Sequence, residues 1–298
     1  MTKQYIIGLG CSYCQGEGAY PPQVVAEHNG FTHLLDDHYH LRSHELEHAW
    51  VNQLTRDHFT RHQSINLGVR GIGARAAVDQ LHFVDQHNIR QGQGVVVLML
   101  PGADRWDMFW KQPRNHRGAQ EPDGYNTGEY QHEKWRTAWP IHNEKGFNGQ
   151  LFGVYARDVW SIQFTALNMM MAILSCQTWC SAHGYDMIMC NAYGDQTPGV
   201  YEWLREHCGS LTDQWDWNQY LHHHTNYTSF LELLVAQDGL MPRADWRDHH
   251  RVYNPRDMMT HSTYLTNDEG THPTILGHQV IAQELANFIT KQGILAKE

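Results

Sequence analysis

Residues 5–16 have the sequence YIIGLGCSYCQG, an apolar run closed by glycine and then a stretch of small and polar residues. A short apolar run that ends in glycine is typical of a buried strand in a parallel sheet. Gly10 allows a sharp turn after this strand, so we expect Ser12 to project its hydroxyl from the edge of the sheet. A serine in such a turn is a candidate nucleophile, and its own N–H can donate to an oxyanion. A plain turn between a strand and a helix would use the same small residues.

Three more segments have the composition of buried strands, and segments with apolar residues at helical spacing separate them. The expected strands cover residues 64–67, 95–100 and 185–190. The expected helices cover residues 43–58, 74–86, 151–183, 229–237 and 274–291. Because strands alternate with helices, we predict an α/β fold, with a central parallel sheet of about five strands and helices on both faces.

Two polar stretches interrupt this alternation, at about residues 103–150 and 191–266. The first is rich in Trp, Asn, Gly, Pro and Arg and is interpreted as a long irregular excursion, whereas the second is expected to contain short helices. Loops of this length are usually functional or mobile. We interpret both stretches as insertions in a single domain that covers residues 1–298.

The carboxyl ends of the expected strands define where a ligand would bind, because ligands of parallel α/β sheets lie at that edge. This rule places Ser12, Gly71, Asp104 and the segment after Cys190 at one edge. Gly71 follows the second strand and can present its N–H without side-chain obstruction, as a second oxyanion donor. An ordinary glycine turn would explain the same residue.

The stretch EGTHPTILGH at residues 269–278 supplies a candidate base. Glu269 stands three residues before His272, Pro273 stiffens the chain, and the last expected helix follows. This arrangement holds an imidazole at the start of a helix, with an acid close enough to orient it. A histidine held in this way is half of a nucleophilic catalyst, and Ser12 would be the other half.

The CSYCQG turn, the block NLGVRG at residues 66–71 and the EGTHPTILGH stretch together resemble the SGNH hydrolase (GDSL-like esterase/lipase) family. The resemblance implies a three-layer α/β/α, flavodoxin-like fold. It also implies that Ser12 is the nucleophile, Gly71 an oxyanion donor and His272 the base. The order of the blocks and their position after strands agree with the family across nearly the whole chain.

Three positions depart from the family pattern. Cys11 stands where the family has an aspartate before the serine, and Glu269 replaces the acidic aspartate, with Asp268 as a rival acid. After the third strand, residues 101–105 read PGADR without the family's asparagine, and Arg105 is the candidate replacement for that oxyanion donor. The loss of one such donor typically lowers turnover by about 10²–10³.

The expected function is therefore that of a serine esterase acting on a small acyl ester, with an O-acetyl group on a glycan as one candidate. No cofactor is expected. Asp104, Trp106 and Trp110 are the candidate substrate-binding residues, although packing of the insertion onto the sheet would explain the same tryptophans. The missing asparagine motivates an alternative from another class, a catalytically degenerate binding or structural module with this fold.

A second alternative comes from HELEH at residues 44–48. H-E-x-x-H on a helix places both imidazoles on one face as zinc ligands, with the glutamate as general base. His44 and His48 would then be the ligands of a zinc hydrolase. Since the chain has 23 histidines, a chance match is unsurprising, and we favour a solvated polar helix face.

Composition limits the remaining possibilities. The formal net charge of −10 argues against a nucleic-acid partner held by a basic surface. No apolar run approaches the roughly 20 residues that span a bilayer, so no membrane partner is expected. The six cysteines do not form a disulfide pattern, and no signal peptide precedes the first strand. We expect a cytoplasmic protein with free thiols that acts on a small-molecule or glycan ester, and the sequence leaves its oligomeric state open.

Overall fold

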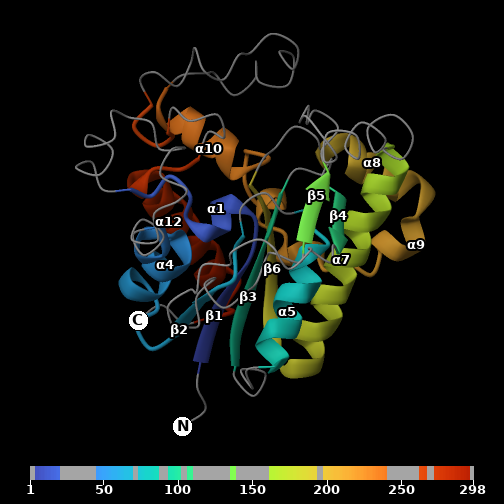
Figure 1. Ribbon diagram of the computed structural model, residues 1–298, viewed down its shortest axis with the longest axis horizontal. Coiled ribbons are helices and arrows are strands. Elements are labelled where there is room, and N and C mark those ends of the chain that lie inside the picture. The colour runs from blue at the N-terminus through green and yellow to red at the C-terminus, as the bar shows by residue number, and fades with distance from the viewer. Residues whose placement is uncertain are drawn as a thin grey trace, which may run out of the picture.

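The computed structural model describes residues 4–20, 45–69, 73–86, 93–101, 106–109, 135–138, 161–192, 197–239, 262–266 and 272–295. These residues form a mixed α/β structure around a parallel sheet (Figure 1). The predicted fold class is confirmed. Of the roughly five strands expected, the described part of the chain contains four in this sheet.

The parallel sheet has the strand order β2-β1-β3-β6. The inner strands are β1 (Gln4–Gly10) and β3 (Gln93–Leu100), and the outer strands are β2 (Gln63–Asn66) and β6 (Tyr185–Asn191). The inner strands are buried along almost their whole length, which agrees with their continuous apolar sequences. Because all three strand pairs are parallel, the carboxyl ends of the four strands share one edge, as predicted from the sequence.

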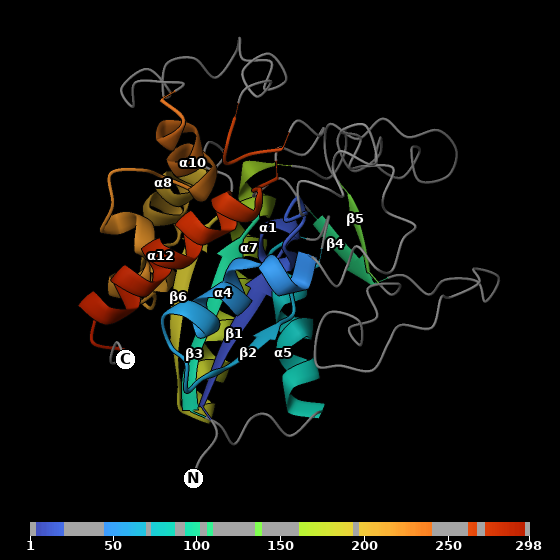
Figure 2. The same cartoon turned by 90° about the vertical axis from the view of Figure 1, so that its left-hand side faces the viewer.

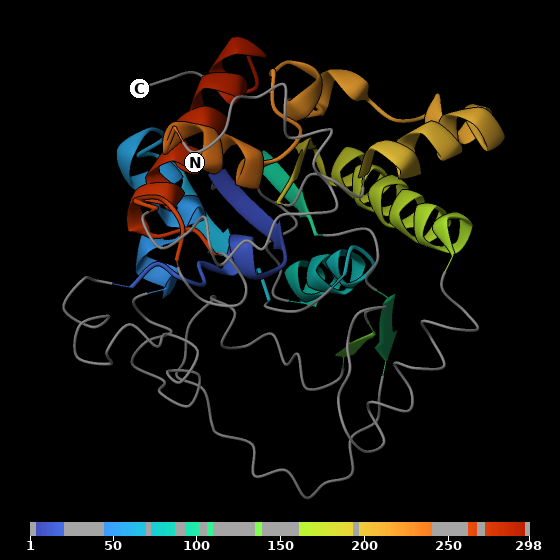
Figure 3. The same ribbon diagram turned by 90° about the horizontal axis from the view of Figure 1, so that it is seen from above.

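Helices cover both faces of the sheet. On one face α12 (Ile275–Lys291) lies beside α4 (Trp50–Asp57), as Figure 2 shows. On the other face α5 (Ala76–Gln86) lies beside α7 (Ile162–His183), and Figure 3 shows the sheet between the two pairs. The second insertion adds α8 (Thr197–His207), which packs against α7. It also contains the short helices α9 (Gly209–Thr212), η5 (Trp217–Gln219), η6 (Leu221–His223) and α10 (Phe230–Gln237). In the described ranges, no helix is both long and apolar enough to cross a membrane.

Side-chain caps fix where the two longest helices begin. The Ser161 hydroxyl accepts a hydrogen bond from the Phe164 N–H at the start of α7 (3.1 Å), and Thr274 accepts one from the Gly277 N–H at the start of α12 (3.2 Å). Gly184 ends α7 in the left-handed conformation, at φ +73°. The cap on Thr274 means that α12 begins only three residues after His272.

The helix expected at residues 43–58 is interrupted. Residues 45–48 form one helical turn, Ala49 has an extended ψ of 146°, and α4 begins at the next residue. The prediction of one continuous helix from apolar spacing was therefore wrong for the first half of this segment. The break leaves Glu45 on a separate turn, where it contacts the segment after β1.

The first insertion is not wholly irregular, contrary to expectation. A two-stranded antiparallel sheet joins β4 (Trp106–Phe109) to β5 (Trp135–Ala138). Each strand is only four residues long. A run of four residues carries too little periodicity to stand out in the polar, aromatic sequence around it.

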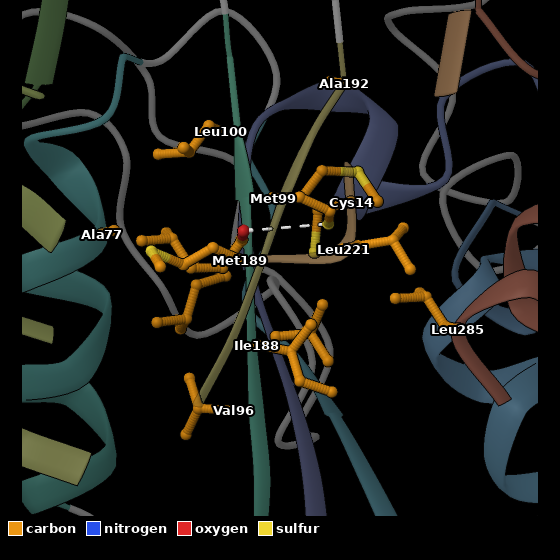
Figure 4. Packing of buried hydrophobic residues seen from close by; sticks show 14 of the residues in the cluster. Cys14, Ala77, Val96, Met99, Leu100, Ile188, Met189, Ala192, Leu221 and Leu285 are labelled. Carbon is orange, nitrogen blue, oxygen red and sulfur yellow. Dashed lines mark hydrogen bonds between the residues drawn. The ribbon is translucent and has the colours of Figure 1, made fainter. Parts of the chain in front are cut away.

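The hydrophobic core lies on both faces of β3 and β6 (Figure 4). Ala77 of α5 packs on one face, and Cys14, Leu221 and Leu285 pack on the other. All four side chains are almost completely buried. The core therefore holds both the turn after β1, through Cys14, and the last helix, through Leu285, against the sheet.

Candidate active site

Ser12 is the first residue of α1 (Ser12–Gln15), a single helical turn directly after β1. Gly10 makes this turn possible, because its φ is +138° and a β-carbon there would lie 2.3 Å from the Met99 carbonyl oxygen on β3. The first N–H groups of a helix have no acceptor within the helix, so the Ser12 N–H is a candidate donor to a bound oxyanion. The serine itself is 2% exposed.

His272 lies opposite Ser12, with 3.0 Å between its Nε2 and the serine Oγ. Thr266 fixes the backbone of this histidine: its hydroxyl accepts the His272 N–H (3.1 Å), and its N–H donates to the His272 carbonyl (2.7 Å). Leu265 and Pro273 add an antiparallel β-bridge. Two short segments therefore hold the imidazole in place just before α12 begins.

Gly18 lets the turn after β1 approach the histidine closely. Its φ is +90°, and a β-carbon there would lie 2.7 Å from the Pro273 carbonyl oxygen and 2.9 Å from the His272 β-carbon. Any larger residue would be strained by the backbone conformation and would also push the histidine loop away. Sequence reasoning passed over this glycine, which stands only two residues after Gly16.

Glu17 is a further carboxylate of the site that sequence reasoning missed. Its Oε2 lies 3.1 Å from His272 Nε2, and the two side chains are 18% and 10% exposed. It faces the same ring nitrogen as Ser12 does, so it is not positioned to orient the imidazole through Nδ1. The local sequence signal for this residue is its place between two glycines, Gly16 and Gly18. Both glycines have positive φ in the structure.

Gln80 on α5 ties the turns after β1 and β2 together. Its Oε1 accepts the Gly10 N–H (3.0 Å), and its Nε2 donates to the carbonyls of Gly10 (3.2 Å) and Leu67 (2.6 Å). The side chain is fully buried. Because one amide satisfies backbone groups of both strand ends, it fixes the separation of these ends at Gly10, two residues before Ser12.

Asn66, at the end of β2, holds α1 from the other side. Its Nδ2 donates to the carbonyls of Cys14 (2.9 Å) and Gln15 (3.2 Å), and its Oδ1 accepts the Gly68 N–H (3.0 Å). Gly68 packs so closely on α1 that a β-carbon would lie 2.3 Å from the Gln15 nitrogen. The contacts with α1 therefore explain why an asparagine and a glycine stand at the end of the second strand.

Glu45, the glutamate that follows the first histidine of the H-E-x-x-H match, faces the segment after β1. Its carboxylate is buried and accepts hydrogen bonds from Gln15 Nε2 (3.2 Å) and from the Tyr20 hydroxyl. It therefore braces this segment. His44 lies outside the described residues. Within the described ranges, no three His, Cys, Asp or Glu side chains are grouped in a way that could hold a metal ion.

Burial controls the ionisation of two groups near the serine. His278 on α12 is completely buried, and burial lowers its pKa to about 3, so this imidazole is neutral at ordinary pH. Burial also raises the pKa of the Cys14 thiol well above its ordinary value. Cys14 therefore stays protonated at neutral pH, so this thiol is a weaker candidate nucleophile than Ser12.

Several of the predicted site residues cannot be placed. The side chain of Trp106, in β4, is not described, and the following residues lie outside the described residues: Gly71, Asp104, Arg105, Trp110, Asp268 and Glu269. The second oxyanion donor, the orienting acid and the substrate-stacking tryptophans accordingly stay predictions from the sequence.

Comparison with known proteins adds little to this geometry. No protein-family model matches the chain, and no curated protein matches it. Among solved structures, the chain is similar to a member of the lipolytic protein G-D-S-L family from Veillonella parvula DSM 2008, with 12% identity and a TM-score of 0.39 over 97% of this chain and 99% of that chain. This likeness is too low to support a conclusion about function. Any such conclusion must rest on the geometry of the serine and the histidine.

Proposed function

We propose that the protein is a serine esterase of the SGNH type that hydrolyses a small acyl ester. The distance of 3.0 Å between Ser12 Oγ and His272 Nε2, at the carboxyl edge of a parallel sheet, carries this proposal. Hydrogen-bond reach between a nucleophile and a base is the first geometric requirement of such a catalyst.

In the proposed reaction Ser12 Oγ bonds to the acyl carbon while its proton moves to His272 Nε2. The tetrahedral intermediate collapses when His272 protonates the leaving alcohol, and an acyl-serine remains. A water molecule then attacks the acyl carbon, gives a proton to His272, and the acid leaves as Ser12 recovers its proton. The N–H groups of Ser12 and Gly71 would bind the oxyanion, with Arg105 as a further donor.

The acid of the proposed triad is Glu269, with Asp268 as its rival. A carboxylate at Nδ1 would fix the tautomer in which Nε2 carries the lone pair that accepts the serine proton. The proposed substrate is an O-acetyl ester on a glycan, and Asp104, Trp106 and Trp110 would bind its sugar. The low exposure of Ser12 favours a small acyl group over a long one.

Hydrolysis of p-nitrophenyl acetate tests the proposal. Replacement of Ser12 by alanine (S12A) should lower kcat/KM by at least about 10³-fold, since triad members act as a unit. Ser210, an exposed serine of α9, provides the matched control, and S210A should hydrolyse the ester at the wild-type rate. Equal rates for S12A and wild type would refute the serine mechanism.

A fluorophosphonate probe separates the esterase from the alternative of a catalytically degenerate binding module. An activated serine reacts covalently with the probe, so wild type should be labelled at Ser12 and S12A should not. Folded wild-type protein that neither reacts with the probe nor hydrolyses the ester would favour the binding module, which the missing asparagine after the third strand motivates.

A further inference from the structure

We propose that Glu17 stabilises the protonated form of His272 by pairing with Nε2, and that it thereby sets the lower pH limit of the reaction. This inference rests on the proposed function, in which Nε2 is the atom that receives and returns the serine proton. Glu17 is separate from Glu269 and Asp268, which the proposed triad assigns to the opposite nitrogen of the ring.

At 3.1 Å the two facing atoms need a proton between them, carried by His272 Nε2 or by Glu17 Oε2. His272 Nε2 lies 3.0 Å from Ser12 Oγ and 3.1 Å from Glu17 Oε2, so two oxygens face one ring nitrogen. A carboxylate has only acceptor atoms, and an unprotonated Nε2 is an acceptor as well, so the two would repel each other at this distance. The contact is attractive when Nε2 carries a hydrogen, which can then face both oxygens.

The position of Glu17 is fixed by the chain on both sides. Gly16 ends α1 with φ +104°, where a β-carbon would lie 2.3 Å from the Glu45 carbonyl oxygen. Gly18 packs against the histidine loop with φ +90°. Because both neighbours are held by close packing, the carboxylate is kept on the Nε2 side of the ring.

Among the charged side chains that the structure describes, Glu17 is recorded beside Nε2, at 3.1 Å. Tyr13, whose ring centroid is 6.0 Å from that of His272, is an uncharged phenol at ordinary pH. Burial keeps His278 of α12, six residues after His272, neutral by lowering its pKa to about 3. An opposite charge within about 4–6 Å typically favours the charged form of a group by 1–3 pH units. The low exposure of both partners limits screening by water and salt.

Two opposing effects on the reaction follow. When Ser12 gives up its proton, Glu17 stabilises the imidazolium that forms at Nε2. When the solution is acidic, the same carboxylate keeps Nε2 protonated before substrate arrives, and Ser12 then has no base. The carboxylate should therefore move the acidic limb of the pH–rate profile to higher pH.

Replacement of Glu17 by glutamine tests this effect with little change of shape, and E17A controls for hydrogen bonding by the new amide. The acidic limb of kcat/KM for p-nitrophenyl acetate should move down by about one pH unit or more in both variants. One unit below the wild-type midpoint, each variant should then retain about fivefold more of its own plateau rate than wild type does. Glu206 of α8, with a side chain that is 78% exposed, gives the charge-matched control E206Q, which should keep the wild-type midpoint. A midpoint in E17Q and E17A within about 0.3 unit of wild type would overturn the inference.

Proton NMR titration of His272 gives a readout that does not depend on turnover. The resonance is identified by its loss in H272Q, and its titration midpoint should fall in E17Q and E17A but not in E206Q. If S12A and wild type hydrolyse the ester equally and this midpoint still falls, the esterase proposal fails and the pairing of Glu17 with Nε2 stands. If S12A is inactive and the midpoint is unchanged, the pairing fails and the esterase proposal stands.

Discussion

Replacement of Gln80 by methionine should destabilise the protein and disturb the site, because this amide connects the turns after β1 and β2. Methionine has nearly the same volume and shape, so the change leaves no large cavity. The Gly10 N–H and the Leu67 carbonyl would lose the hydrogen bonds that Gln80 supplies. The Gly10 carbonyl would keep the hydrogen bond it accepts from the Val69 N–H (2.9 Å).

The size of the effect follows from these two backbone groups. A buried donor or acceptor that loses its partner costs about 1–3 kcal/mol, so Q80M should lower the free energy of unfolding by about 2–6 kcal/mol. That is a large share of the roughly 5–15 kcal/mol that stabilises a typical domain. The turn that carries Ser12 should also shift, and a displacement of about 1 Å can lower catalysis by about 10²-fold.

Urea unfolding followed by tryptophan fluorescence measures the change. Q80M should lower the midpoint without altering the dependence of the free energy on urea concentration. The matched control is Gln283 of α12, an exposed residue whose amide donates to Asn287 Oδ1 (2.9 Å). Q283M should change stability by no more than about 0.5 kcal/mol. Equal stability of Q80M and Q283M would refute the role assigned to Gln80.

Two further predictions concern the histidine loop and its neighbour. G18A should lower both the free energy of unfolding and esterase activity, because alanine is strained at φ +90° and its β-carbon would contact Pro273 and His272. G239A controls for the backbone strain alone, since Gly239 has φ +67° with no described atom within 4 Å of an added β-carbon. If G18A and G239A had equal effects on urea unfolding and on ester hydrolysis, the packing argument would be contradicted. His278 has a pKa of about 3 in the folded protein and about 6.5 when unfolded, so only the unfolded chain gains its proton as the pH falls between these values, and stability is lost. Wild type should therefore lose about 2 kcal/mol more than H278N between pH 7 and pH 5 in urea titrations, and parallel losses would argue against a buried neutral imidazole.

The parallel sheet and the positions of Ser12 and His272 follow from local sequence patterns. Glycine ends an apolar strand just before the serine, and proline and a threonine cap begin a helix just after the histidine. Such signals act over a few residues, and so the sequence alone reveals them.

The residues that complete the site do not have such signals. Gln80 lies in a helix where a glutamine would normally face solvent, and it is buried only because α5 packs against the ends of two strands. Glu17 becomes part of the site only when a loop about 255 residues further along the chain packs against Gly18. The helical turn before the interruption at Ala49 likewise makes tertiary contacts, from Glu45 to Gln15 and Tyr20, that the local sequence does not reveal. Propensity and periodicity contain no information about these long-range contacts.

The contact between Ser12 and His272 joins residues 260 positions apart, and this separation affects how the site is gained and lost. Closing so long a loop is entropically unfavourable, so the two residues should meet late in folding, when α12 docks beside α4. At that junction Gln53 Nε2 donates a hydrogen bond to the Ile275 carbonyl (3.4 Å), and α12 buries apolar side chains such as Ile281 and Leu285 in the core. A partial opening that released α12 would separate the base from the nucleophile while leaving the four-stranded sheet paired. The serine–histidine pair thus reports on the docking of one helix, and its reactivity should disappear whenever that docking is lost, even where the sheet stays intact.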